Sequence, residues 1–223
     1  MIQNNFNDFR KFALDRNVSR SYLDCMERNV YPTIVEERSS ATRAIEMNVF
    51  SRLMYDRIIY FSGEVTDDAC DTVVAQLLYL ANADESRDIT LYINSPGGDI
   101  TAGLGVVDTM DFVKPDVATI CVGMAASMGA VLLSNGTKGK RGILPHSRVM
   151  IHSASSYMGG HTADVDIRVE QLHRAQNDVY ETLAKNCGKT MDEIKALCDR
   201  DNWFIGKEAI DLGIADILFE KKS

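Results

Sequence analysis

The chain has 223 residues, of which 45% are hydrophobic and 25% charged, and its formal net charge is −8. These values are typical of one globular domain with a sizeable core, and the acidic balance argues against a surface that binds nucleic acid or an anionic membrane. Five cysteines, an odd number with no CxxC spacing, argue against a disulfide framework or a zinc site and favour a reducing compartment such as the cytoplasm.

Residues 1–30 differ in composition from the rest of the chain. They mix polar and charged residues with scattered aromatic ones, and they lack the hydrophobic stretch of a secretory signal. Tyr31-Pro32 ends any helix there. We interpret residues 1–30 as an N-terminal extension or pro-segment and residues 31–223 as a single domain. The polar stretch from Glu36 to Glu46 is expected to be an exposed loop.

From residue 57 onward, short β-branched runs alternate with amphipathic segments. The strands are predicted at 57–61, 89–93, 117–122, 148–153 and 217–219. The helices are predicted after Thr66, from about 100, from 128, at 163–186, after Thr190, which forms a capping box with Glu193, and at 206–212. Residues 138–142 are expected to be a basic turn, and Cys121 a core residue of its strand. This alternation predicts an α/β fold with a mostly parallel sheet and helices on its faces. The helix at 163–186 carries charge around most of its circumference, which favours packing against another subunit. No apolar run reaches the length of a transmembrane helix.

Residues 118–133 form the most informative junction of a strand and a helix. Ser127 is the one hydroxyl between them, and small residues such as Gly123, Ala126 and Gly129 surround it. A serine at such a turn resembles a nucleophile elbow, where the first helical amides can stabilise negative charge on a carbonyl oxygen. The alternative is a serine that caps the helix N-terminus, which is the commoner use of serine at this place.

A nucleophilic serine needs a base, and the chain has four histidines. His152 ends a predicted strand, from which it can reach a neighbouring junction, although a strand histidine is more often a partly buried structural residue. His146 is expected in a turn, and His161 and His173 are expected to face solvent.

The stretch Ser95-Pro96-Gly97-Gly98 follows another strand. Its glycines predict either a plain turn or a close approach of backbone amides to a ligand. It is not a phosphate loop, because no Gly-Lys-Ser/Thr follows.

Four motifs together resemble those of the Clp protease proteolytic subunit family (ClpP). They read G-M-A-A-S-M-G-A, N-S-P-G-G, L-P-H-S-R-V-M-I-H and D-R-D-N-W-F, and the resemblance runs from about Tyr31 to the C-terminus. The spacings from Ser127 to His152 and from His152 to Asp201, 25 and 49 residues, also match that family. The resemblance implies a ClpP/crotonase-like fold, with a helix–strand handle protruding over about 153–188.

The resemblance also implies the roles of individual residues. Ser127 is the nucleophile, His152 is the general base and then the general acid, and Asp201 orients His152. The backbone amides of Gly98 and Met128 form the oxyanion hole. Without the resemblance, Asp201 is equally well explained as a loop carboxylate that pairs with Arg200 next to it.

The same resemblance implies an assembly. Members form homo-oligomers of two stacked heptameric rings, and an AAA+ ATP-dependent unfoldase feeds them unfolded protein substrates. Asp199 and Arg200 match a pair that joins the rings and senses oligomer formation. Tyr92 belongs to the implied docking cleft, and the implied pore loops lie near residues 36–44. We expect no cofactor, no metal and no nucleotide in this subunit.

The sequence departs from the family pattern in the segment that follows the histidine. Where many members have His-Gln-Pro, this chain has His152-Ser153-Ala154, and the glycines of the next segment are displaced to Gly159-Gly160. Thr90 and Gly142 stand where aromatic residues often line the docking cleft. Cleavage preference, ring stability and unfoldase affinity are therefore open.

We conclude that the chain is a cytoplasmic serine endopeptidase that cleaves unfolded polypeptides. One alternative is a catalytically silent structural ring subunit, and another is a crotonase-type acyl-CoA hydratase or isomerase. A third is an α/β-hydrolase esterase that pairs Ser127 with His173 and with Asp164 or Asp166.

Overall fold

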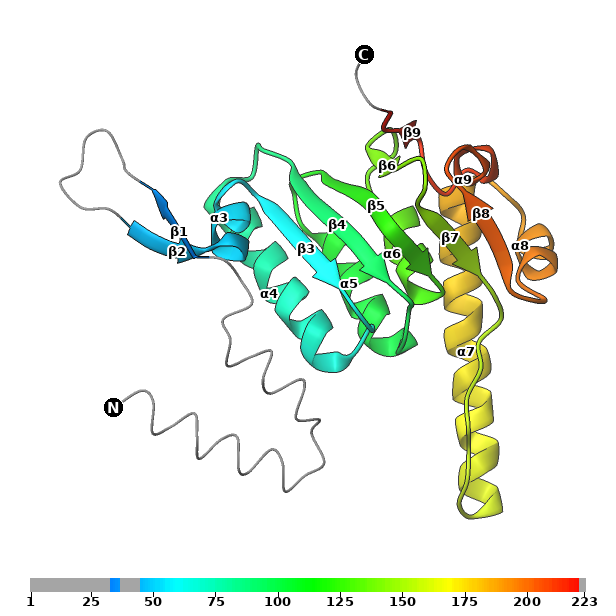
Figure 1. The fold of residues 1–223 in the computed structure, drawn as a ribbon. Helices are drawn as coiled ribbons and strands as arrows, with labels where there is room; N and C mark the ends of the chain where they lie inside the picture. Colours follow the sequence, from blue (N-terminus) through cyan, green and yellow to red (C-terminus); the bar gives the residue numbers. More distant parts are fainter. Residues whose placement is uncertain (1–32, 37–44, 221–223) are drawn as a thin grey trace. The chain divides into compact units, whose positions relative to one another are not determined.

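The structure is a computed structural model that describes residues 33–36 and 45–220 (Figure 1). The chain divides into two compact units, residues 1–56 and residues 57–223, and each is described by itself. The predicted extension at 1–30 and the implied pore-loop residues 37–44 lie outside the described residues. So does Cys25.

The first unit contains an antiparallel pair of strands, β1 (Thr33–Glu36) and β2 (Ile45–Asn48), followed by helix α3 (Val49–Tyr55). The sequence patterns predicted none of these three elements. We expected loop from Glu36 to Glu46, whereas strand structure includes Glu36 and resumes at Ile45.

The second unit is built on a sheet whose main path is β3 (Ile58–Ser62), β4 (Ile89–Ser95), β5 (Val117–Ala126), β6 (Arg141–Ile143) and β9 (Ile217–Leu218). All neighbours along this path are parallel. Strand β7 (Arg148–Ile151) also pairs with β5 in parallel, and β8 (Asn202–Ile205) pairs with β7 antiparallel. The prediction of an α/β fold with a mostly parallel sheet is therefore confirmed.

Three helices pack together on one side of β3–β5 (Figure 1): α4 (Asp67–Ala83), α5 (Ile100–Phe112) and α6 (Met128–Ser134). Burial alternates along β4, where Ile89, Leu91 and Ile93 are fully buried between partly exposed residues. That alternation shows one face of the strand in the core and the other face uncovered within this chain. As predicted, Thr66 caps α4, and its hydroxyl accepts a hydrogen bond from the Ala69 amide.

Strand β5 is longer than predicted and shares one edge between two partners. Its first half, Thr119–Cys121, pairs with β6, and its second half, Met124–Ala126, pairs with β7. Ser147 fills the break between them, because its hydroxyl accepts from the Gly123 amide at 2.9 Å and donates to the Cys121 carbonyl at 3.1 Å. Cys121 itself is a buried core residue, as predicted.

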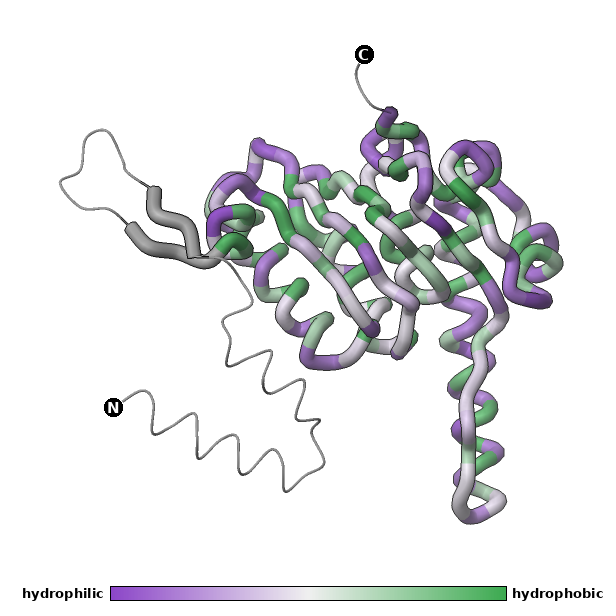
Figure 2. Tube along the Cα trace, in the orientation of Figure 1, coloured by the Kyte–Doolittle hydropathy of each residue, from purple (hydrophilic) through white to green (hydrophobic). Residues whose placement is uncertain are grey.

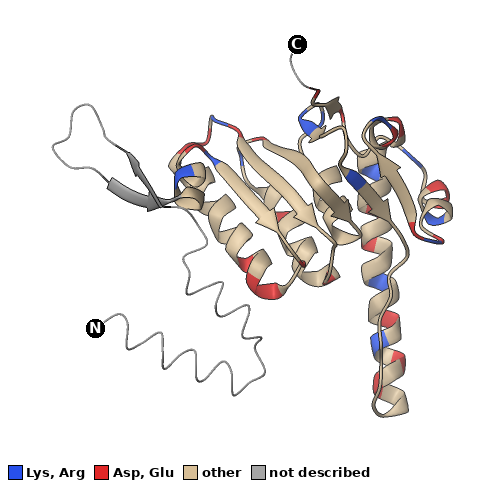
Figure 3. Ribbon diagram, viewed as in Figure 1, with Lys and Arg blue, Asp and Glu red and all other residues tan. Residues whose placement is uncertain are grey.

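The chain after β7 turns back into the long helix α7 (Thr162–Cys187), which was predicted at 163–186. Figure 1 shows α7 projecting beyond the sheet with residues 152–161 running alongside it. Its projecting part alternates hydrophobic with hydrophilic residues and carries both charges (Figures 2 and 3). Helices α8 (Met191–Leu197), with the predicted capping box of Thr190 and Glu193, and α9 (Lys207–Leu212) follow. Across the described residues, no helix has both the length and the hydrophobicity needed to cross a bilayer.

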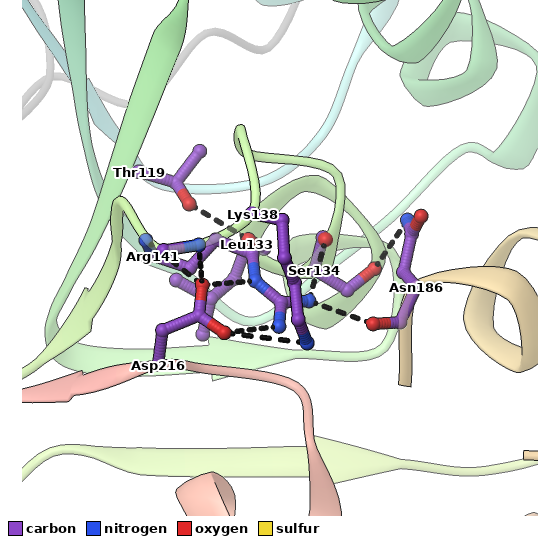
Figure 4. Close-up of polar contacts among 8 residues, drawn as sticks. Thr119, Leu133, Ser134, Lys138, Arg141, Asn186 and Asp216 are labelled. Carbon is purple, nitrogen blue, oxygen red and sulfur yellow. Dashed lines mark hydrogen bonds and ion pairs between the residues drawn. The ribbon is translucent and has the colours of Figure 1, made fainter. Parts of the chain in front are cut away.

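A buried polar cluster, which we call the Arg141 cluster, joins β6 to the ends of two helices (Figure 4). Arg141 is 1% exposed; its guanidinium binds both carboxylate oxygens of Asp216 at 2.7 and 2.6 Å and donates to the carbonyls of Ser134 and Asn186. Burial acts to raise the pKa of Asp216, but hydrogen bonds from Arg141 and the Gly139 amide outweigh it, so the net pKa lies well below its usual value.

The same cluster corrects one prediction. We expected residues 138–142 to be a basic turn; residues 138–139 form an exposed turn, whereas 141–143 form the buried strand β6. The reason is that the charge of Arg141 is neutralised by Asp216, which lies 75 residues away in sequence.

Candidate active site

The end of β5 places Ser127 in a strained backbone conformation. Its φ and ψ are 53° and −122°, and within the described residues only one other non-glycine residue, Arg57, has a positive φ. The Ser127 amide is held by the carbonyl of Met150 on the neighbouring strand at 2.8 Å. Backbone strain of this kind gathers at functional sites, where the surrounding structure enforces it.

The hydroxyl of Ser127 does not cap the helix that follows it. Ser127 occupies the N-cap position of α6, but its side chain makes no capping hydrogen bond. The capping interpretation of the sequence is therefore wrong, and the hydroxyl is available for another partner.

That partner is His152, which leaves the adjacent strand β7. Strands β5 and β7 are parallel, with Ala126 beside Met150, so the residues that follow both strands emerge at the same edge of the sheet. The Nε2 atom of His152 lies 2.9 Å from Oγ of Ser127. At this distance a neutral imidazole can accept the hydroxyl proton.

Asp201 comes from the turn that precedes β8. Because Ile151 pairs with Asn202 in the antiparallel β7–β8 register, Asp201 lies opposite His152. Its Oδ1 atom is 3.2 Å from Nδ1 of His152, which assigns the Nδ1 proton to this contact and leaves the Nε2 lone pair facing Ser127. The His152 side chain is 27% exposed, whereas that of Asp201 is 63% exposed in the single subunit.

The glycine loop after β4 packs directly against Ser127. A Cβ atom on Gly97 would lie 2.6 Å from Cβ of Ser127, and one on Gly98 would lie 2.2 Å from the carbonyl oxygen of Val65. Both residues also have a positive φ, of 94° and 151°. Only glycine satisfies this combination of space and backbone angle. The glycines therefore allow the loop to pack closely against Ser127 and Val65, and the approach of its amides to a ligand stays a prediction.

Two residues that line the space around Ser127, Gly98 and Met128, are of interest for their backbone amides. Val65 bonds to the residues on either side of Gly98, accepting from Asp99 and donating to Gly97, so the N–H of Gly98 itself points away from Val65. The amide of Met128 is the first of α6, where helix geometry provides no acceptor. Among the described residues, neither amide donates a hydrogen bond. Both were predicted to form the oxyanion hole.

The space around Ser127 has two parts. An open cleft is lined by Glu64, Pro96, Gly97, Gly98, Ile100, Ser127, His152, Ala154 and Ser155. A narrow, mostly apolar pocket beside it is lined by Ile100, Ser127, Met128, Val131, Ile151, His152, Ala154, Gln176, Val179, Tyr180 and Leu183. An open cleft and a narrow, mostly apolar pocket therefore lie next to each other at Ser127.

Sequence reasoning missed the pocket residues that α7 contributes, above all Gln176 and Tyr180. Nothing in the sequence singled them out, because α7 was interpreted as a charged helix that packs on another subunit. The structure shows that part of its apolar face closes the pocket behind Ser127.

The remaining candidates lie apart from this site. His161 and His173 are exposed and His146 lies in a turn, as the sequence predicted, and His152 rather than His173 contacts Ser127. The esterase alternative, which needs His173 as the base for Ser127, is therefore not supported.

The predicted ring-joining pair is exposed too, with side-chain exposures of 82% for Asp199 and 92% for Arg200. Asp201 contacts His152 and not the adjacent Arg200. Arg200 instead contacts Asp199, at 4.0 Å. No group of three potential metal ligands occurs among the residues that the structure describes.

Comparison with known proteins gives the same family throughout. A family model described as Clp protease matches residues 40–222. The chain is 43% identical over 220 residues to a protein of Porphyromonas gingivalis (strain ATCC BAA-308 / W83), covering 96% of this chain and 98% of that one. It is equally identical over 220 residues to a protein of Bacteroides fragilis (strain YCH46), covering 96% and 99%. Both are named ATP-dependent Clp protease proteolytic subunit.

Proposed function

Since the chain belongs to the Clp protease family and is a serine endopeptidase, we propose that Ser127, His152 and Asp201 carry its chemistry. The observation that supports this most directly is the continuous row of contacts from Asp201 through His152 to Ser127, 3.2 and 2.9 Å long. The row ends on a hydroxyl that is held on a strained turn and makes no capping bond.

The proposed reaction has two stages. Oγ of Ser127 attacks the carbonyl carbon of the scissile peptide bond while its proton passes to Nε2 of His152. The imidazolium then protonates the leaving amine, the C–N bond breaks, and an acyl ester remains on Ser127. In the second stage, water gives a proton to His152 and attacks the ester, and the acid product leaves with Ser127 restored.

The amides of Gly98 and Met128 are the proposed donors to the oxyanion of both tetrahedral intermediates. Both residues line the space around Ser127, and their amides have no competing acceptor among the described residues. Each such donor contributes roughly 3–4 kcal/mol to lowering the barrier in enzymes of this kind. We place the side chain of the substrate residue that forms the acyl group, P1, in the apolar pocket.

The substrates we propose are unfolded polypeptides, cut into short peptides. The relatives are named as subunits of an ATP-dependent protease, and from that name we infer an ATP-dependent unfoldase, of the AAA+ class, as the partner of this chain. We further propose a homo-oligomer of two stacked heptameric rings, with Asp199 and Arg200 joining the rings. Their exposure in the single subunit, 82% and 92%, supports this, because side chains that join subunits must be accessible before assembly. The four described cysteines are free thiols, and we infer a cytoplasmic location.

The test is labelling with a fluorophosphonate serine probe, followed by native mass measurement of the same samples. Wild type is expected to label on Ser127, and Ser127→Ala is expected to lose the label while keeping its oligomeric mass. The matched control is Ser155→Ala, because Ser155 is an exposed serine that lines the same cleft. That variant keeps the label. Label that persists in Ser127→Ala would end the proposal, and coenzyme A binding would favour the crotonase-type alternative.

A further inference from the structure

One hydrogen bond ties the wall of the substrate cleft to the long helix. The backbone amide of Ala154, two residues after His152, donates to Oε1 of Gln176 at 2.9 Å, and the contact is partly buried. Gln176 belongs to the middle of α7, 22 residues further along the chain. Since only its carbonyl oxygen can accept from an amide, this contact also fixes the orientation of the Gln176 side-chain amide.

The segment that this bond holds has little else to position it. Residues 152–160 lie between β7 and α7 and belong to neither a helix nor a strand. Within the described part of the chain, the other hydrogen bond from this segment to α7 joins Gly159, at its far end, to the exposed Arg168. Next to the catalytic histidine, the Gln176 contact is therefore the single polar attachment of the segment to the helix.

The attachment lies at the boundary between the two parts of the site. Ala154 lines both the open cleft and the apolar pocket, and Gln176 lines the pocket together with Ser127 and His152. Ser155, the residue that follows Ala154, also lines the open cleft.

We propose that Gln176 is a positioning residue that sets the shape of the P1 pocket, and hence its preference for large apolar side chains. The inference rests on the proposed function of Ser127 and deepens it. Without the acceptor, the Ala154 amide would be left unpaired beside an apolar pocket, and the segment would move to let water reach it. The wall of the pocket would then lose its fixed position.

This interpretation also gives a physical reason for the departure from His-Gln-Pro at residues 152–154. Proline has no N–H and a fixed φ, so it needs no acceptor on α7 and restrains the segment by its own ring. Alanine leaves an N–H that requires a partner, and Gln176 provides it.

The experiment is a double-mutant cycle of Gln176→Met and Ala154→Pro in the full-length, assembled protein. The readout is the ratio of kcat/KM for short peptides with leucine at P1 to that for otherwise identical peptides with alanine at P1. Gln176→Met keeps the length of the side chain and removes the acceptor. We expect the ratio to fall about tenfold, mainly through a higher KM for the leucine peptide. In the Ala154→Pro background the same substitution should change the ratio less than twofold.

Gln171→Met is the matched control, because Gln171 is an exposed glutamine of the same helix whose side chain makes no hydrogen bond among the described residues. It should leave the ratio unchanged. The proposal is overturned if Gln176→Met leaves the ratio unchanged, or changes it equally in both backgrounds. If assembled Gln176→Met protein no longer labels with the fluorophosphonate, Gln176 positions His152 and not the wall of the pocket. This result also overturns the proposal. If the fluorophosphonate labels Ser127 in the wild-type protein, the proposed function of Ser127 holds even when one of these outcomes overturns the role of Gln176.

Discussion

Two acidic side chains of this protein each sit beside a basic one, and the two pairs are built in opposite ways. Asp216 is 14% exposed and receives two hydrogen bonds from Arg141, which is 1% exposed. Asp201 is 63% exposed and makes one contact with His152, at the longer distance of 3.2 Å. The first pair is largely buried within the subunit, whereas the carboxylate of the second pair is exposed to solvent.

The difference separates the requirements of folding from those of chemistry. A buried guanidinium tolerates no missing partner, because removing its carboxylate leaves an uncompensated charge in the core. An exposed ion pair contributes little to stability, since water and salt screen it. The fold therefore depends on Asp216 and the proposed reaction on Asp201. The clearest test is to remove each carboxylate in turn and measure both properties.

The largest expected effect is that of Asp201→Asn on catalysis. An amide in place of the carboxylate neither holds the required tautomer of His152 nor stabilises the imidazolium, so kcat should fall on the order of 10⁴-fold. Because Asp201 is exposed, the free energy of unfolding should change by less than about 0.5 kcal/mol. Peptide hydrolysis and denaturant unfolding of the same preparation measure the two quantities. A large loss of stability with little loss of kcat would reverse the comparison.

Asp216→Asn is expected to do the opposite. The Arg141 guanidinium would remain buried without a countercharge, and the free energy of unfolding should fall by about 3–5 kcal/mol. Fluorophosphonate labelling per folded subunit should be retained, because Asp216 makes no contact with the three proposed catalytic residues. Urea unfolding at a fixed protein concentration, with labelling below the transition, checks this. Equal stability of the variant and wild type would show that the cluster is dispensable.

The pH dependence of the stability that Asp216→Asn loses provides a further test of the same ion pair. The pKa of Asp216 is lower in the folded protein than in the unfolded chain, so the pair contributes its full stability above the unfolded value of about 4. The contribution is lost as the pH falls through the lower, folded value. The difference in unfolding free energy between wild type and Asp216→Asn should thus be constant at neutral pH and shrink below about pH 4. A difference that grows on acidification would contradict the depressed pKa.

The smallest expected effect concerns the reactivity of two side chains, that of Cys121 within strand β5 and that of Ser127 directly after it. Cys121, in the middle of β5, is fully buried, and burial raises the pKa of its thiol to about 12. At pH 8 roughly one molecule in 10⁴ therefore carries the thiolate that reacts. Iodoacetamide should leave Cys121 unmodified in native protein while a fluorophosphonate labels Ser127 next to the end of the strand. Peptide mapping after alkylation measures both, with the partly exposed Cys187 as an internal comparison.

The main helices and strands could be predicted because each bears its own local signals. The cap at Thr66, the capping box at Thr190 and the apolar face of α4 all lie within a few residues of what they determine. The predicted limits of α7 are within one residue of those in the structure at both ends. The alternation of these elements was enough to predict the parallel sheet.

The short elements could not be predicted because distant residues determine them. Strand β6 contains a buried arginine whose partner lies 75 residues away, so its sequence looked like a surface turn. Strand β8 exposes Trp203 and Ile205 and buries neither of its other residues fully, and so it lacks the burial pattern of a core strand.

The site shows the same limit. The resemblance gave the order of Ser127, His152 and Asp201 in the sequence, but their meeting depends on the pairing of β7 with both β5 and β8. No local sequence pattern predicts either pairing. The contact of Gln176 with Ala154 is a further example, because the sequence showed Ala154 as a departure from the family pattern but gave no sign of its partner on α7.

The backbone of Ser127 has a consequence for how such a sequence is maintained in evolution. A residue with a side chain at φ 53° and ψ −122° is strained by about 1–3 kcal/mol, and glycine would relieve that strain. A lineage selected for thermal robustness alone would therefore drift toward glycine at position 127. If Ser127 carries the reaction as proposed, a descendant that had lost its peptidase role would be expected to show this replacement early.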